Sequence, residues 1–271
     1  MAGSKATADA IRKHLPMDER LEQHHQLNGL LRHMAQWRGT VLGNSYVRQH
    51  GLTIYSGPFK GMEYLDHSTE GCLLARLLGC YEAELHDDLK AFAGENLEAI
   101  VDIGCAEGYY AVGLARMMPG VTVHAYDTEP RARASCRDLA EKNGVADRVV
   151  IGETFTGDMF ETFTDRRTLV MIDTEGFEED LMRPETWPAL ARLAIIMETH
   201  PEKHPDIVAT MLARFTATHD ILLRSTGPRT ADLPGWLLEL PQLDQLLAIW
   251  EHRATATPWF VMRPKGWSAA A

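Results

Sequence analysis

The chain of 271 residues has few cysteines, no long apolar run and no excess of positive charge, and each absence excludes a class of protein. The four cysteines form no C-x-x-C pair and have no spacing typical of zinc sites, so we expect buried free thiols. No stretch reaches the roughly 18 consecutive apolar residues of a membrane span. The first fifteen residues lack the apolar centre of a secretory signal. We therefore expect a cytoplasmic protein with no membrane partner.

The charge balance argues against a nucleic-acid partner. The formal net charge is -11, whereas proteins that bind nucleic acids through phosphate contacts carry a basic patch. Residues 1–60 differ from the rest because they hold eight Lys and Arg against four Asp and Glu. A basic arm on an acidic body predicts packing against that body or against a partner subunit. We predict a homodimer on this ground.

The first third of the chain has helical periodicity. Residues 7–42 place apolar side chains at helical spacing, and Pro16 is expected to split them into two helices. Residues 51–64 mix β-forming residues with Gly and Pro, which indicates a hairpin or an ordered loop. Residues 69–93 are again predicted to be helical.

From residue 97 onward, short apolar strands alternate with helices. Helices are expected at 108–118, 130–143, 177–183, 205–218 and 241–253, and strands at 98–103, 121–126, 148–152, 168–173, 193–199, 219–225 and 257–263. This alternation predicts an α/β fold: a doubly wound, Rossmann-like, seven-stranded and mostly parallel sheet. We divide the chain into an N-terminal helical extension, 1–56, serving as a lid or dimer contact, and a catalytic domain, 57–271.

The loop after the first strand is the most informative motif. "AIVDIGCAEGYYAVGLA" (residues 99–115) has the spacing D-x-G-x-x-x-G, whereas the dinucleotide fingerprint is G-x-G-x-x-G. Asp102 and Glu107 would repel a pyrophosphate, so the loop suits a cationic ligand or one rich in donors. Asp127 ends the second strand, where a carboxylate commonly accepts ribose hydroxyls. An NAD-dependent oxidoreductase remains the alternative enzyme.

These segments resemble a known enzyme family. "VDIGCAEGYYAVGLA" followed by "VHAYDTEP" is similar to the first two motifs of class I S-adenosylmethionine-dependent methyltransferases. "VVIGETF" and "LVMIDTEGFEEDLM" resemble their segments after the third and fourth strands. Together with "IIMETHP" and the upstream "GPFKGMEYL" and "LLGCYEAEL", they resemble the FkbM-like branch over residues 57 to 201.

The resemblance implies roles for individual residues around S-adenosylmethionine. Asp102, Gly104 and Gly108 are expected to shape the loop around the methionine part, and Glu107 to reach its ammonium group. The ribose and adenine are expected at Asp127, Thr128, Glu153 and Thr154. An upstream segment is expected to fold over the cofactor, and it supplies the candidates Lys60, Tyr81 and Glu82.

A second group of residues follows the fourth and fifth predicted strands. Asp173 and Glu175 come after one strand, and Glu198 and His200 after the other, so they are expected to meet at one edge of the sheet. In one interpretation Asp173, Glu175 and His200 are catalytic, with Asp173 or His200 as general base. In the other, Asp173, Glu198 and His200 hold a divalent metal such as Mg²⁺ or Mn²⁺. A structural role before Pro201 is the third alternative.

The predicted activity is methyl transfer from S-adenosylmethionine to a small molecule. The resemblance favours O-methylation of a hydroxyl on a metabolite or glycan, as in natural-product biosynthesis. Clustered carboxylates keep N-methylation of an amine or guanidinium group as the alternative. A non-catalytic cofactor-binding protein is the more distant one. Aromatic side chains could line the acceptor pocket, although core packing is the commoner use: Trp236, Trp250 and Trp259.

Overall fold

The computed structural model describes residues 2–14, 23–69, 71–225, 227, 230–253 and 255–267. Its centre is a seven-stranded sheet in the order β3-β2-β1-β4-β5-β7-β6, in which β7 alone runs antiparallel to its neighbours. The strands are β1 (Ala99–Ile103), β2 (Thr122–Tyr126), β3 (Val149–Gly152), β4 (Thr168–Ile172), β5 (Ala194–Glu198), β6 (His219–Arg224) and β7 (Trp259–Pro264). The predicted doubly wound, mostly parallel fold is confirmed, with strand ends within one or two residues of expectation.

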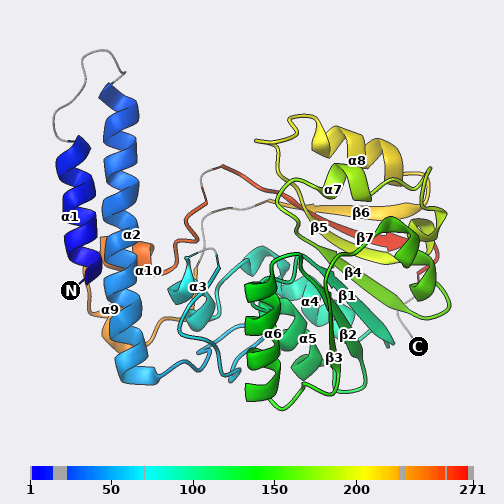
Figure 1. Cartoon of the computed structure of the whole chain (residues 1–271), viewed down its shortest axis with the longest axis horizontal. Helices are drawn as coiled ribbons and strands as arrows, with labels where there is room; N and C mark the ends of the chain where they lie inside the picture. Colours follow the sequence, from blue (N-terminus) through cyan, green and yellow to red (C-terminus); the bar gives the residue numbers. More distant parts are fainter. Residues whose placement is uncertain are drawn as a thin grey trace.

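Helices cover both faces of this sheet (Figure 1). One face packs against α3 (Leu73–Leu78), α4 (His86–Ala93), α5 (Tyr109–Met117) and α6 (Pro130–Lys142). The other packs against η2 (Gly157–Phe163), α7 (Glu178–Leu181), η3 (Pro188–Arg192) and α8 (Ile207–Phe215). Because side chains alternate along a strand, Ile100 joins the first core and Val101 the second. Burial on both faces explains why the strands are continuous apolar runs.

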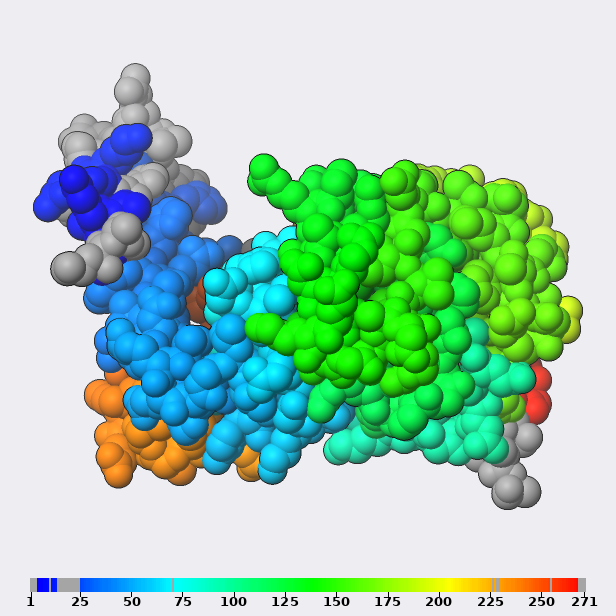
Figure 2. All heavy atoms as spheres, turned by 60° about the horizontal axis from the view of Figure 1, so that its bottom comes forward, coloured from blue at the N-terminus to red at the C-terminus, as the bar shows by residue number. Residues whose placement is uncertain are grey.

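The N-terminal extension consists of α1 (Ala2–His14) and α2 (Gln23–His50). The predicted break at Pro16 lies outside the described residues. The connection between β6 and β7 carries α9 (Gly235–Leu238) and α10 (Gln242–Ala248), which lie beside α2 and away from the sheet (Figures 1 and 2). Arg38 on α2 pairs with Asp244 on α10 at 2.6 Å. The division at residues 56 and 57 stays a prediction.

Four helix predictions are wrong in extent. The helical region expected over 7–42 continues to His50 in α2. The helix expected over 69–93 is interrupted between α3 and η1 (Ala83–Leu85), because Gly79 adopts a φ of 76° and ends α3. A Cβ there would lie 1.9 Å from the carbonyl oxygen of Ser56, so only glycine fits this close approach. The helix expected over 241–253 ends at Ala248, and 177–183 forms one turn, α7.

The segment 51–64 is an ordered loop with one isolated bridge, Thr53 to Glu63. Among the described residues, no helix combines the length and apolar character needed to span a membrane. Parallel strands β1, β4 and β5 end at the same edge of the sheet, and that edge positions the site.

Candidate active site

The loop between β1 and α5 is bent tightly against β2 and β4. The N–H groups of Gly104 and Cys105 donate to the carbonyl of Tyr126 at 2.9 and 3.0 Å. Gly104 has a φ of 85°, and a Cβ there would lie 1.7 Å from the carbonyl oxygen of Asp173. Ala106 is also left-handed, with a φ of 46°. The loop therefore brings its backbone directly beside the end of β4.

Two carboxylates flank this loop, and they differ in their hydrogen bonds. Asp102 is 4% exposed, and within the described structure its Oδ2 has no hydrogen-bond partner. Burial, followed by the nearby charge of Asp127, raises the pKa of Asp102 to about 7. Asp127 itself accepts hydrogen bonds from the N–H groups of Ala106 at 2.9 Å and Glu129 at 2.8 Å. Asp102 thus carries an acceptor atom that no group among the described residues satisfies.

The predicted adenine-side residues lie at the exposed end of β2 and β3. Thr128, Glu153 and Thr154 are all exposed. Arg133 holds the first two, because it donates to the carbonyl of Thr128 at 2.9 Å and lies 3.3 Å from the Glu153 carboxylate. Only an open surface is available to a ligand there.

Glu107 does not fulfil the role expected of it. Its buried carboxylate accepts hydrogen bonds from the hydroxyl of Tyr64 at 2.5 Å and from the N–H of Thr69 at 3.1 Å, and it lies 3.7 Å from Arg76. Burial opposes its charge, but Arg76 and these hydrogen bonds lower its pKa overall. Because the upstream segment uses both of its oxygens, Glu107 anchors that segment rather than an ammonium group.

Tyr81 and Glu82 form the wall of the site that the upstream segment was expected to supply. The guanidinium of Arg76 stacks on the Tyr81 ring at 3.9 Å. Glu82 is buried with a φ of 48°, and its carboxylate accepts hydrogen bonds from Tyr110 and from Arg253. A left-handed residue of this kind is strained and marks a position that its surroundings enforce.

Lys60 is not brought to this wall. It lines a separate hollow with residues at the carboxyl end of α5, among them Arg116 and Met117, whereas the loop lies at the amino end of that helix. Its predicted contact with the cofactor therefore has no support in the fold.

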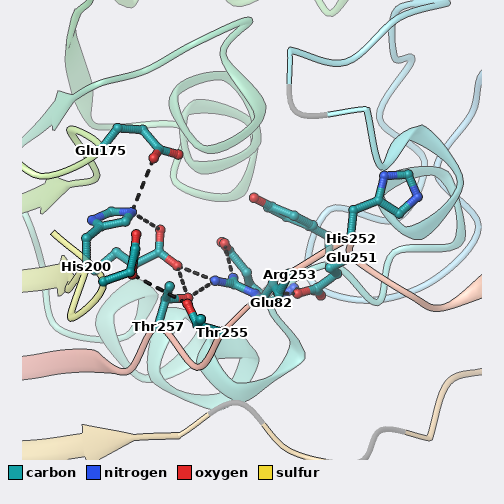
Figure 3. Close-up of a pocket in the computed structure, with 11 residues that line it drawn as sticks. Glu82, Glu175, His200, Glu251, His252, Arg253, Thr255 and Thr257 are labelled. Atoms are coloured by element: carbon teal, nitrogen blue, oxygen red, sulfur yellow. Dashed lines mark hydrogen bonds and ion pairs between the residues drawn. The ribbon is translucent and has the colours of Figure 1, made fainter. Parts of the chain in front are cut away.

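The residues after β4 and β5 converge as predicted. His200 Nε2 lies 3.7 Å from Asp173 Oδ1, 3.6 Å from Glu175 Oε2 and 3.7 Å from Glu198 Oε2. We call these four side chains the strand-end cluster, and Figure 3 labels two of them, Glu175 and His200. The three whose ligand atoms all lie within 4.8 Å of one another are Asp173, Glu175 and His200. Glu175 thus takes the place that the sequence gave to Glu198, whose other oxygen is held by Arg253 and Thr257.

Glu178, which the sequence did not single out, orients this cluster. It is fully buried, and its Oε1 accepts hydrogen bonds from the N–H groups of Thr174 at 2.9 Å and Gly176 at 3.2 Å. The same oxygen lies 3.2 Å from His200 Nδ1. Burial opposes both charges, but the mutual contact lowers the pKa of Glu178 to about 2 and raises that of His200. Glu178 therefore fixes the imidazole so that Nε2 faces Asp173 and Glu175.

A pocket of about 380 Å³ opens beside the cluster. Glu175, Glu198 and His200 line it, and Tyr81 and Arg253 form other parts of its wall (Figure 3). A smaller cleft of about 30 Å³ also has Tyr81 in its wall. Its lining includes three residues that the sequence assigned to a cofactor, Asp102, Gly104 and Glu107, and the catalytic candidate Asp173, together with Arg76, Tyr110 and Trp259. The two hollows share Tyr81, so a group bound in the cleft lies next to the pocket.

The family comparison matches the part of the chain that carries this loop. A family model described as the methyltransferase small domain matches residues 88–181, from α4 to α7. Residues 88–181, about a third of the chain, are therefore similar to a methyltransferase domain. No curated protein matches its sequence.

Several solved structures are similar to this chain. One is a SAM-dependent methyltransferase from Geobacter sulfurreducens in complex with S-adenosyl-L-homocysteine, at 17% identity and a TM-score of 0.42, covering 68% of this chain and 91% of that one. Another is precorrin-6y C5,15-methyltransferase from Geobacter metallireducens GS-15, which is 13% identical in sequence with a TM-score of 0.41. The match covers 66% of this chain and 87% of that one. A third is TrmN from Thermus thermophilus, which is 14% identical in sequence with a TM-score of 0.44. The match covers 71% of this chain and 52% of that one.

Two arginines of the site were missed in the sequence analysis. Arg76 is buried within the apolar run "LLARLL". A charged residue in such a run would be costly to bury without an internal partner, so its presence there could have indicated a buried ion pair. Arg253 lies in the irregular segment after α10 and pairs with carboxylates from three parts of the chain: Glu82, Glu198 and Glu251. Burial opposes its charge, yet these carboxylates raise its pKa above the ordinary value.

None of the three tryptophans lines the pocket beside the cluster. Trp259 is buried in the core and lines the smaller cleft. Trp236 donates to His50 at 3.0 Å, and Trp250 packs against His252 with ring centroids 4.6 Å apart.

Proposed function

We propose that this protein transfers the methyl group of S-adenosylmethionine to a hydroxyl of a small molecule or a sugar-containing metabolite. The observation that carries the proposal is the position of the strand-end cluster between the cleft and the 380 Å³ pocket. Asp173 lines the cleft, and Glu175, Glu198 and His200 line the pocket. Groups that can take up a proton therefore lie where a hydroxyl acceptor would meet the methyl donor.

The charged side chains lining the cleft suit the methionine end of S-adenosylmethionine, whereas the cleft itself, at about 30 Å³, encloses only a small part of that molecule. When bound, this cofactor supplies a methyl group on a positively charged sulfur, and the acceptor displaces it in line. Asp102 offers the cofactor's ammonium group a buried carboxylate with an unsatisfied oxygen. Arg76 is the one Lys or Arg among the described residues that line the cleft, and it suits the carboxylate end. Asp127 would accept the ribose hydroxyls, and the side chains of Thr128, Glu153 and Thr154 lie toward the adenine end.

The pocket favours small, polar acceptors. Its volume is close to the lower limit of typical ligand pockets, about 300 Å³. Its lining contains hydroxyl and carboxylate groups that can accept the hydrogen bonds of a polyol: Glu82, Glu175, Glu198, Glu202, Thr255 and Thr257. A glycan or natural-product acceptor, as the FkbM-like resemblance predicts, suits such a lining.

N-methylation of an amine or guanidinium group is the second candidate. The lining holds five glutamates against one arginine, Arg253, which is already paired with three of them. A cationic acceptor would be attracted to this excess of negative charge. The acceptor atom therefore decides between the two candidates.

A methyl-transfer assay tests the proposal. The protein is incubated with methyl-labelled S-adenosylmethionine and matched panels of polyols and glycosides on one side and small amines on the other. We expect label in the hydroxyl panel, and at least a 100-fold loss of rate in His200→Asn with His67→Asn as the matched control. If label appears only in the amine panel, the proposed O-methylation is wrong and N-methylation takes its place. Full activity of His200→Asn would remove the strand-end cluster from the reaction.

We also propose that the protein is a homodimer joined through α2. Leu27, Leu31 and Met34 are more than half exposed, although each is large and apolar. Their spacing places them on the same side of the helix as Arg38, which packs on α10. These three side chains thus continue, toward the amino end of α2, the side of the helix that packs on α10. The α2 helix of a second copy would cover them.

A further inference from the structure

We propose that Asp173, Glu175 and His200 bind one divalent cation of the Mn²⁺ type, and that this cation receives two oxygens of the acceptor. The inference rests on the proposed function and adds to it the chemical class of the acceptor. The ligand atoms of these three side chains lie within 4.8 Å of one another. In an octahedral site with bonds of about 2.1–2.2 Å, neighbouring ligands are about 3 Å apart and opposite ones a little over 4 Å. The observed separations need only a small contraction around an ion.

The imidazole of His200 supplies an observation independent of the carboxylates. His200 is 3% exposed, and in the described part of the chain its Nε2 has no hydrogen bond. The nearest carboxylate oxygens lie at 3.6–3.7 Å, which is longer than the 2.7–3.2 Å of an N–H···O hydrogen bond. A buried ring nitrogen that faces three oxygens without bonding any of them is arranged as a metal ligand is.

Glu178 gives His200 the outer contact that metal-binding histidines commonly have. A histidine ligand usually shares its second nitrogen with a carboxylate or carbonyl, which fixes the ring orientation. Glu178 Oε1 lies 3.2 Å from Nδ1, a contact between opposite charges without the geometry of a hydrogen bond, and it accepts the N–H groups of Thr174 and Gly176. The turn that carries Glu175 and the ring of His200 are therefore positioned by one buried carboxylate.

The remaining carboxylate of the cluster is already neutralised from the other side. Glu198 is bound through Oε1 by Arg253 and Thr257. Lys203 contacts Glu175 from the solvent side at 3.3 Å, and its exposed side chain can move away. A cation between Asp173, Glu175 and His200 would offset the negative charge at the centre of the cluster.

The ligand set indicates both the kind of metal and the kind of acceptor. Carboxylates with one imidazole and no thiolate favour an octahedral ion such as Mn²⁺ over a structural zinc. Three protein ligands leave three positions, and two of the ligands, Glu175 and His200, line the 380 Å³ pocket. An acceptor with two adjacent oxygens, such as a vicinal diol or an α-hydroxy acid, can occupy two of these positions. The ion would lower the pKa of the bound hydroxyl and so prepare it for methylation.

Mn²⁺ binding to the full-length protein, without cofactor or acceptor, tests the site directly. Protein freed of metal with a chelator is titrated with MnCl₂, and free Mn²⁺ is followed by its electron paramagnetic resonance signal. We expect one ion per chain. The dissociation constant should rise at least tenfold in His200→Asn and Asp173→Asn but stay unchanged in His67→Asn and in Asp138→Asn, which changes an exposed carboxylate on α6. Thermal unfolding of each variant shows that it is folded.

Two results would overturn the metal site: no stoichiometric binding, or binding that His200→Asn and Asp173→Asn leave unchanged while both are folded. The methyl-transfer assay in excess chelator separates this failure from failure of the proposed function. Methylation of a hydroxyl that persists in chelator keeps the function and refutes the metal. One tightly bound Mn²⁺ without methylation of any vicinal-oxygen acceptor refutes the acceptor class and leaves the site.

Discussion

Replacing Asp102 by Asn should stabilise the protein at neutral pH while it weakens cofactor binding. The carboxyl is buried in the cleft, and its pKa is raised to about 7 by burial and by Asp127. In the unfolded chain an Asp ionises near its ordinary value of about 3.9. Between these two values the folded protein holds a proton that the unfolded chain has lost. Stability should therefore fall as the pH rises from about 4 to about 7.

The magnitude follows from the size of the shift. A rise from 3.8 to about 7 corresponds to roughly 4 kcal/mol of cost at pH 8, at about 1.36 kcal/mol for each pH unit. Asn removes this cost but leaves an amide N–H₂ near the unsatisfied position, which costs about 1–2 kcal/mol. We therefore expect Asp102→Asn to raise the free energy of unfolding by about 2 kcal/mol at pH 8. The gain should vanish below about pH 5.

Urea unfolding at pH 5 and pH 8, without cofactor, measures this difference. Asp138→Asn is the matched control, because Asp138 is an exposed carboxylate on α6. Calorimetry should show at least a tenfold weaker affinity of Asp102→Asn for S-adenosylmethionine, since the ammonium group loses its counter-charge. If Asp102→Asn is less stable than the wild type at pH 8, or if its effect is the same at both pH values, the assigned ionisation is wrong.

Three further variants address other parts of the structure. Gly104→Ala should destabilise the protein by about 3 kcal/mol or more in urea unfolding, because its Cβ would meet the carbonyl of Asp173, whereas Gly120→Ala, with open space, should change stability by less than about 1 kcal/mol. Arg76→Met should weaken S-adenosylmethionine binding about tenfold in calorimetry, and unchanged affinity would contradict its pairing with the cofactor carboxylate. Light scattering should show a dimer for the wild type and a monomer for Leu31→Glu. A monomeric wild type at micromolar concentration would refute the α2 contact.

The sheet could be predicted because its sequence signal is local. Each strand is a short apolar run bounded by turn residues, so all seven were placed nearly to the residue. The helix expected over 69–93 failed because its apolar periodicity continues through Gly79, while the close approach of Ser56 that stops it comes from a distant segment. Local pattern thus predicted the elements, and tertiary contact determined where they end.

The site divides in the same way. Asp102, Asp173 and His200 follow strands, and parallel strands bring their ends to one edge, so topology alone predicted that they meet. Arg76 and Arg253 come from segments without a strand register, and nothing in their spacing indicates that they face the same site.

The carboxylates of the site show why residue type alone does not predict chemistry. Glu107 and Glu178 are buried, yet each accepts several hydrogen bonds from backbone and side-chain donors, and the pKa of each is lowered. Among the described residues, Asp102 and Glu178 each have one buried oxygen without a hydrogen-bond partner. Glu178 lies beside His200, whereas Asp102 lies near the charge of Asp127, and the pKa of Asp102 is raised. A neighbouring cation or several donors keep a buried carboxylate charged, whereas burial beside another carboxylate favours the protonated form. The sequence places each of the three within two residues of a glycine, but only the charges and donors that the fold brings around each carboxylate separate Asp102 from Glu107 and Glu178.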